Sequence, residues 1–233
     1  MHAMMRQLHG KAEKKSVQAA PVETKGLTLN SGWTYDLLEW PLDPFVFRGA
    51  LGALRRRTID LARLQSGERA LDVGCGTGTL ALAAQRRVGA AGYMAGIDPG
   101  PAQIARARAK TARSHQAADF QVGVIEKLPF ADQSFDVVFS TLMMHHLPAP
   151  LKRQGLAEVA RVLKPGGRLV IADFARKQDR RGLAAHFHAG GSDIPALVNM
   201  AREAGFSVVT TENMPAPRFS TFPGASFIVA RRS

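Results

Sequence analysis

The sequence predicts an α/β fold, a three-layer sandwich around a seven-stranded, mostly parallel sheet with an antiparallel last strand. From Arg69 onward, short apolar runs alternate with segments of helical periodicity, a pattern typical of parallel strands covered by helices on both faces. The last two apolar runs are joined by a Pro-rich stretch, residues 214–224, which is too short to contain a crossover helix. The last two strands should therefore be antiparallel.

The individual elements follow from apolar runs and breakers. We expect strands near residues 69–73, 93–97, 120–125, 135–140, 168–174, 206–212 and 226–231. Helices are expected from about Ala50 to Leu64, from about Leu80, and before Pro165, which with two glycines should stop the helix. In that last helix, Leu156, Val159 and Leu163 share one face and should pack on the sheet.

The chain reads as one domain preceded by an arm. Residues 1–26 are expected to form a flexible basic arm, and residues 27–233 a single domain whose segment 30–65 caps the ligand cleft. No apolar run is long enough for a membrane span, and the start has no signal-peptide pattern. The default expectation is a cytoplasmic protein. The single cysteine, Cys75, agrees with a reducing compartment.

The most informative segment is Leu71 to Gly78, which reads Leu-Asp-Val-Gly-Cys-Gly-Thr-Gly. A buried strand here runs into a glycine-rich turn, and glycine allows the backbone to approach a ligand closely. The spacing Gly-x-Gly-x-Gly differs from the Gly-x-Gly-x-x-Gly of dinucleotide sites. Asp72 would repel a pyrophosphate and would favour a cofactor carrying an ammonium and a sulfonium. The segment therefore argues against a nicotinamide cofactor.

This segment resembles motif I of class I S-adenosylmethionine-dependent methyltransferases. Further stretches resemble the family's motifs in the same order, namely residues 95–99, 126–130, 134–139 and 161–168. The resemblance covers roughly residues 30–233 and is greatest to the small-molecule branch that includes the quinone methyltransferases. It implies a Rossmann-like fold, S-adenosylmethionine as cofactor, and methyl transfer to oxygen, nitrogen or carbon of a small or lipid-like acceptor. The alternative is a cofactor-binding or charge-driven binding protein without turnover.

The cofactor site follows from the turn and from this resemblance. Asp98 ends the second expected strand, where a carboxylate can accept hydrogen bonds from both ribose hydroxyls. Asp72 should organise the turn and the amino-acid end of the cofactor, with a purely structural cap as the alternative. The expected cofactor-binding residues are Asp72, Gly74, Cys75, Gly76, Gly78, Asp98, Pro99, Ile125 and Ser140.

Adenine recognition departs from the family's pattern. The family usually has an acid just after the glycine of the third strand, but here Gly123 is followed by Val124 and Ile125. Ile125 could hold the adenine ring by apolar packing. Glu126 could swing in toward the adenine amino group, although the expected state is a solvated Glu126.

A catalytic base is not forced by the sequence. His145 and His146 follow the fourth strand, and either could deprotonate a hydroxyl acceptor. The favoured expectation is that one packs, the other bonds backbone, and proximity alone carries the transfer. Further candidates are Tyr35, Asp36, Asp173, His186 and His188. No metal site is expected, because His186 and His188 have no evident third ligand.

The formal net charge is +12, from 31 Lys and Arg against 19 Asp and Glu. The basic residues are spread along the chain, and the aromatic residues lie mostly in expected strands, which argues against nucleic acid as a partner. A solvated Arg-rich surface is the favoured interpretation. Peripheral contact with an anionic membrane surface is the alternative, and it would suit a lipid-like substrate. The oligomeric state is not predicted.

Overall fold

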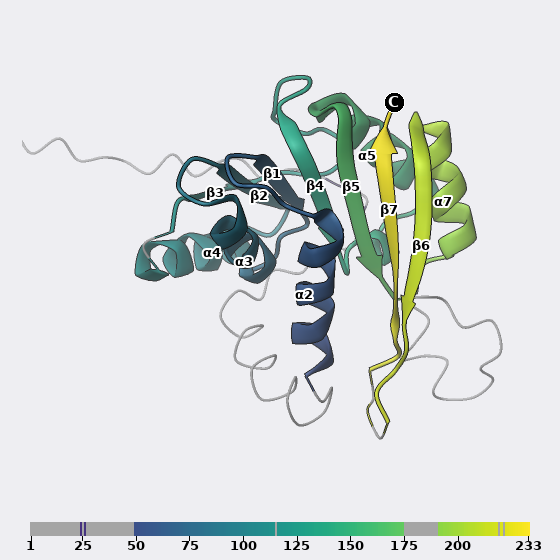
Figure 1. Cartoon of the computed structure of the whole chain (residues 1–233), viewed down its shortest axis with the longest axis horizontal. Coiled ribbons are helices and arrows are strands. Elements are labelled where there is room, and N and C mark those ends of the chain that lie inside the picture. The colour runs from purple at the N-terminus through teal and green to yellow at the C-terminus, as the bar shows by residue number, and fades with distance from the viewer. Residues whose placement is uncertain are drawn as a thin grey trace, which may run out of the picture.

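The computed structural model describes residues 24, 26, 49–114, 116–174, 191–218, 220 and 222–233. Its centre is a seven-stranded sheet with the strand order β3-β2-β1-β4-β5-β7-β6 (Figure 1). The strands are β1 (Arg69–Val73), β2 (Tyr93–Asp98), β3 (Ala118–Val122), β4 (Phe135–Thr141), β5 (Leu163–Asp173), β6 (Phe206–Met214) and β7 (Ala225–Arg232). The expected seven-stranded sheet is confirmed.

Neighbouring strands from β3 to β5 pair in parallel, whereas β7 is antiparallel to both β5 and β6. The last strand is therefore the antiparallel one, as the short Pro-rich connection required. It enters the sheet between β5 and β6, so the carboxyl-terminal strand is internal and β6 forms the edge.

Helices cover both faces of the sheet (Figure 1). They are α2 (Ala50–Ala62), α3 (Thr79–Val88), α4 (Pro101–Ser114), α5 (Ala149–Val162) and α7 (Ile194–Glu203), and a short 3₁₀ turn, η1, covers Met144–His146. Helices α3 and α4 pack on β1 to β3, α2 packs on β4, β5 and β7, and α5 and α7 pack on each other and on the β5 to β6 side. The result is the expected three-layer sandwich.

The core is divided between the two faces by the alternation of side chains along each strand. Leu71 and Val138 face α5 and α7, in one cluster with Leu156 and Val159. Neighbouring residues such as Phe139 face α2, α3 and α4 in the opposite cluster. Because central strands bury both faces, their sequences are nearly continuous apolar runs, which is why the runs predicted the strands well.

Several boundaries differ from the expectations by a few residues, and two of the differences are informative. Strand β3 ends at Val122, not at residue 125, because its partner β2 ends at Asp98, which is opposite Val122. Helix α5 ends at Val162, and Leu163 already belongs to β5. The segment of Pro165 and its two glycines therefore lies in the first part of a bulged strand and does not stop the helix. Leu163 is nevertheless fully buried.

The fold brings the ends of four strands together. The order in which successive strands are added to the sheet reverses between β1 and β4, which is the topological switch point. Ligands of such sheets bind at this point, outside the carboxyl ends of the strands. Asp98 ends β2 and Asp173 ends β5, while Gly74 follows β1 and Leu142 follows β4. The residues that the sequence singled out thus meet at one edge of the sheet.

Several expectations fall on residues outside the described ranges. These are most of the basic arm, residues 30–48 of the expected cap segment, and the side chains of Tyr35, Asp36, His186 and His188. The described part of the cap segment is α2 and the residues around it. Among the helices of the described ranges, none combines the length and the apolar character that crossing a membrane requires.

Candidate functional site

The glycine turn follows β1 and leads into α3. Gly74, Gly76 and Gly78 all have positive φ, at 75°, 52° and 78°, which side chains other than glycine adopt only with strain. The amides of Gly74 and Cys75 both donate to the Ile97 carbonyl at 2.9 Å, so β2 anchors the turn. A Cβ on Gly78 would lie 2.7 Å from the Phe120 ring, so this glycine serves packing at the start of α3.

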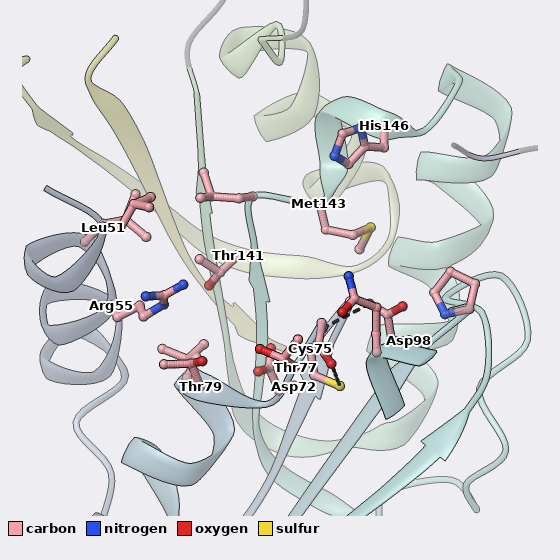
Figure 2. A pocket seen from close by; sticks show the side chains of 17 residues that line it. Leu51, Arg55, Asp72, Cys75, Thr77, Thr79, Asp98, Thr141, Met143 and His146 are labelled. Atoms are coloured by element: carbon pink, nitrogen blue, oxygen red, sulfur yellow. Dashed lines mark hydrogen bonds between the residues drawn. The ribbon is translucent and has the colours of Figure 1, made fainter. Parts of the chain in front are cut away.

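An open cavity lies against this turn, with about 850 Å³ of space free of atoms, including the solvent at its mouth. It is bounded by the glycine turn, the ends of β2 and β4, and helix α2 (Figure 2). Its walls are Leu51, Leu54, Arg55, Asp72, Gly74, Cys75, Gly76, Thr77, Thr79, Leu80, Asp98, Pro99, Gln103, Thr141, Leu142, Met143 and His146. The cavity therefore gathers most of the expected cofactor-binding residues.

Asp98 is held in place by backbone amides. Its carboxylate accepts from the Gly76 amide at 3.0 Å and from the Gly100 amide at 2.8 Å, one on each oxygen. Burial raises the pKa of this carboxyl group, and the two amides act against the shift. Since a carboxylate oxygen has two acceptor sites, each oxygen keeps capacity for one further donor. Asp98 thus fixes the glycine turn and still presents acceptors at the cavity.

Asp72 is the most strongly perturbed acid of the site. Its side chain is 1% exposed, and burial together with the nearby charge of Asp98 raises its pKa to about 7. The positive charge of Arg55 and the amide of Ala81 act in the opposite direction. The Ala81 contact corresponds to the expected structural cap at the start of α3, and the position in the cavity wall leaves the carboxylate available to a cation. Both roles proposed for Asp72 are therefore compatible with its surroundings.

The raised pKa makes a prediction about stability. The folded-state pKa of Asp72 lies above its unfolded value of 3.8, so its contribution to stability is lost as the pH rises through the window from about 4 to about 7. Asp72→Asn removes this titration. The stability of the variant relative to the natural protein should therefore rise by about 2 to 3 kcal/mol between pH 5 and pH 8. Denaturant unfolding of the cofactor-free proteins at both pH values measures the difference, and an equal difference at both would contradict the assignment.

Several cavity residues were missed by the sequence analysis, and three polar ones matter most for ligand binding. Arg55 projects from α2 toward the cavity, opposite the glycine turn (Figure 2). Thr141, at the end of β4, and Gln103, on α4, each have a buried side-chain oxygen without a hydrogen-bond partner in the described part of the chain. Only the polar type of these residues was visible in the sequence. Their convergence on the cavity depends on the fold.

Ser140 differs from its expected position. It is fully buried, and it is not among the residues that line the cavity, whereas its neighbour Thr141 is. Successive side chains of a strand point to opposite faces, so the two adjacent residues of β4 cannot both face the same space. Thr141 takes the place at the cavity that the sequence analysis gave to Ser140.

A second hollow adjoins the first, with about 370 Å³ of space free of atoms. Pro99 and Ile125 line it, as expected, and Met143 and His146 line both hollows. Glu126 also lines it, and its carboxylate accepts a hydrogen bond of 2.6 Å from the Thr24 hydroxyl. Glu126 is half-buried, so its side chain combines partial exposure to solvent with this contact. The Thr24 contact joins residues 102 positions apart, which no local pattern indicates.

The two histidines lie in the 3₁₀ turn after β4, and they differ in their contacts. Nδ1 of His145 lies 2.6 Å from a carboxylate oxygen of Asp173, and the His145 amide donates to the other oxygen at 2.8 Å. His146 lines the cavity (Figure 2), and its pKa is lowered by burial and by His145. The ring centroids of the two histidines are 3.9 Å apart. His145 bonds a buried carboxylate, in addition to the backbone contact.

The backbone between β4 and the histidines is bent. Leu142 has a φ of 54°, which is uncommon for a residue with a side chain, and its amide donates to the Ala172 carbonyl at 2.8 Å. This contact ties the end of β4 to β5, next to Asp173. Such strained residues cluster at functional sites, where the surrounding structure compensates for their cost. The bend places the histidine turn beside the end of β5.

Comparisons with known proteins agree with this geometry. A model of the methyltransferase domain matches residues 70–167. The 27-O-demethylrifamycin SV methyltransferase of Amycolatopsis mediterranei is 31% identical over 188 residues, which cover 75% of this chain and 67% of that protein. A ubiquinone/menaquinone biosynthesis C-methyltransferase of Geobacter sulfurreducens is 35% identical over 128 residues, 54% of this chain and 49% of that protein. The chain spans about half the length of several curated relatives that it matches.

The fold is also found in solved structures. A SAM-dependent methyltransferase from Aquifex aeolicus superposes with a TM-score of 0.67 at 20% identity, covering 86% of this chain and 97% of that chain. At this identity the likeness establishes the three-layer fold, while the relative from Amycolatopsis mediterranei establishes the family. The chain therefore belongs to the S-adenosylmethionine-dependent methyltransferases.

Proposed function

We propose that this protein transfers the methyl group of S-adenosylmethionine to a hydroxyl oxygen of a small organic molecule. The observation that carries the choice of oxygen is the 2.6 Å contact between His145 Nδ1 and the buried carboxylate of Asp173. A hydroxyl is a weak nucleophile until it loses its proton, and a histidine oriented by a carboxylate is the arrangement that accepts such a proton. An acceptor that is already nucleophilic would need no such pair.

The residues of the cavity fit S-adenosylmethionine. A Cβ on Gly76 would meet no atom within 4 Å, so the absence of a side chain leaves ligand space at the turn. The unpartnered oxygens of Gln103 and Thr141 need hydrogen-bond donors, which the ammonium and hydroxyl groups of the cofactor can supply. The carboxyl groups of Asp72 and Asp98 complement its positive charges.

Within the two hollows, each part of the cofactor has a matching wall. Asp98 would accept from the ribose hydroxyls with the acceptor sites that Gly76 and Gly100 leave free. Asp72 would face the ammonium group, and Arg55 would face the carboxylate of the methionine moiety. Ile125 and Pro99 would hold the adenine ring by apolar contact.

Glu126 extends the proposed adenine site. One of its carboxylate oxygens is engaged by Thr24, and the other can accept from the adenine amino group. This residue would supply the acidic contact that the sequence lacks directly after Gly123. Thr24 would then act by holding the carboxylate at the hollow.

When bound, S-adenosylmethionine supplies an electrophilic methyl group on a positively charged sulfur. The contribution of the chain is alignment, exclusion of water and proton transfer. Asp173 accepts at Nδ1 of His145, so the neutral ring carries its proton there and its lone pair on Nε2. His145 itself lines neither hollow, but its ring centroid lies 3.9 Å from that of His146, which lines both. An acceptor beside His146 would give its hydroxyl proton to Nε2 as the oxygen attacks the methyl carbon. The electron pair of the broken carbon–sulfur bond stays on sulfur.

His146 and the apolar residues of the cavity would contact the acceptor. The lowered pKa of His146 favours a neutral ring at physiological pH, which can accept or donate a hydrogen bond to an acceptor in the cavity. Leu51, Leu54 and Met143 line the same space. An acceptor with a hydroxyl on an apolar body suits these walls. The acceptor is thus a small or lipid-like molecule.

The test is methyl transfer to a panel of hydroxyl compounds. The full-length protein is incubated with carbon-13 methyl-labelled S-adenosylmethionine and with phenols, hydroquinones and hydroxylated polyketides, each paired with an amine analogue. We expect labelled methoxy groups, which carbon-13 chemical shifts separate from methyl groups on nitrogen or carbon. Transfer to the amine analogues or to ring carbon alone would contradict an oxygen acceptor. Cofactor binding by calorimetry with no transfer to any compound would support a binding protein instead.

A further inference from the structure

The carboxylate behind His145 has a complete set of hydrogen bonds. Asp173 is fully buried at the end of β5. One of its oxygens accepts from His145 Nδ1 at 2.6 Å and from the Phe174 amide at 2.9 Å. The other accepts from the His145 amide at 2.8 Å and from the Ser192 hydroxyl at 2.8 Å. A carboxylate has about four acceptor sites, so these four donors account for all of them.

Of these donors, Phe174 is the next residue in the chain, and His145 donates through both its ring and its backbone amide. Ser192 donates through its side chain alone. It lies just before α7, whose N-cap is Asp193, and it is 1% exposed. Its amide donates to the Phe174 carbonyl at 2.7 Å, which holds the Ser192 backbone beside the end of β5. The hydroxyl is therefore delivered to Asp173 by a backbone contact that does not depend on it.

We infer that Ser192 is a positioning residue of the base, acting on His145 through Asp173. This inference rests on the proposed function. The terminal torsion of an aspartate is soft, so its carboxylate rotates easily unless donors hold both oxygens. Phe174 and Ser192 hold opposite oxygens, and together they keep one oxygen directed at Nδ1 of His145. Outer hydrogen bonds of this kind fix the tautomer and the ring orientation of a functional histidine.

The two roles of Ser192 can be separated by substitution. Ser192→Ala removes the hydroxyl that positions Asp173. It keeps the backbone amide contact with Phe174, which holds this segment beside the end of β5. We expect the turnover number to fall about tenfold, with the KM of the acceptor and the affinity for S-adenosylmethionine nearly unchanged. Ser192→Thr keeps the hydroxyl and should restore turnover. Ser226→Ala is the matched control, because the buried Ser226 hydroxyl donates to Asn213 and not to Asp173.

A spectroscopic readout is independent of turnover. In protein with nitrogen-15 labelled histidine, the His145 signals, assigned with His145→Gln, should show the proton on Nδ1. In Ser192→Ala they should shift toward a mixture of tautomers. Unchanged His145 signals together with unchanged turnover in Ser192→Ala would overturn the inference. If the signals shift while His145→Gln remains fully active, the positioning stands and the proposed base fails.

A double-mutant cycle gives the final discrimination. If Ser192 acts through His145, then Ser192→Ala in a His145→Gln background should lower turnover no further. Additive losses would instead assign Ser192 a structural role separate from the base. Because this comparison uses only the alanine variant, it holds even if the methyl group of threonine is too large for the buried position.

Discussion

Gly76→Val is expected to abolish S-adenosylmethionine binding while the domain stays folded. Gly76 has a φ of 52°, and its missing Cβ would meet no protein atom within 4 Å. Valine would therefore fill space in the cavity without colliding with the core, and its branched Cβ would resist the positive φ. The expected local strain is about 1 to 3 kcal/mol. The Gly76 amide also donates to Asp98, so a displaced turn would disturb the ribose contact that we propose.

Calorimetry with S-adenosylmethionine and with its demethylated product, alongside thermal unfolding, measures the two effects. We expect the affinity to fall by at least about 100-fold, which corresponds to about 2.7 kcal/mol. Gly67→Val is the matched control, since Gly67 has a φ of 86° and an equally open Cβ position but is not part of the cavity wall. It should lose similar stability and keep cofactor binding. Retained binding in a Gly76→Val protein with a collapsed melting temperature would contradict the prediction.

Gly74 shows that position within the turn decides the outcome. A Cβ on Gly74 would lie 2.4 Å from Cγ of Met143, so a substitution there strains the packing beneath the histidine turn as well as the cavity. Gly74 and Gly76 are two residues apart and look alike in sequence. Their different surroundings follow from the segment after β4, which crosses only one of them.

The strands could be predicted from the sequence because parallel strands buried on both faces need nearly continuous apolar runs. The same signal failed at Val124 and Ile125, which are apolar and buried but lie in a turn beyond β3. Burial and strand conformation are separate properties, and an apolar run reports only the first. Likewise, Pro165 precedes two glycines and looks like a helix stop, yet it lies in the bulged first part of β5.

The candidate site was predictable where one local segment encodes it. The glycine turn and Asp98 carry their geometry in spacing and strand ends. The contact of His145 with Asp173 joins residues 28 positions apart, and that of Thr24 with Glu126 joins residues 102 apart. Such contacts depend on strand order and on loop closure, which residue types alone do not encode. The preference for an acceptor that needs no base rested on treating His145 without its carboxylate.

His145→Gln is expected to lower the turnover number by about 10² to 10⁴-fold with a hydroxyl acceptor, while the affinity for S-adenosylmethionine stays nearly intact. The backbone amide of residue 145 still donates to Asp173 in this variant, and the glutamine side chain cannot take a proton at neutral pH. Asp173→Asn is a poorer test. It would place an amide group, with two donors of its own, where four donors already converge.

His146→Gln provides the matched comparison, since the two histidines are adjacent, their rings are in contact, and only His146 lines the cavity. If His146 orients the acceptor, its loss should raise the KM of the acceptor and lower turnover by about tenfold or less. Steady-state kinetics of both variants, with cofactor affinity and melting temperature as controls, separates the roles. A larger loss in His146→Gln than in His145→Gln would make the cavity-facing histidine the base. Full activity in both variants would show that the acceptor is nucleophilic enough to react without a base. Asp173 would then be a structural partner of His145.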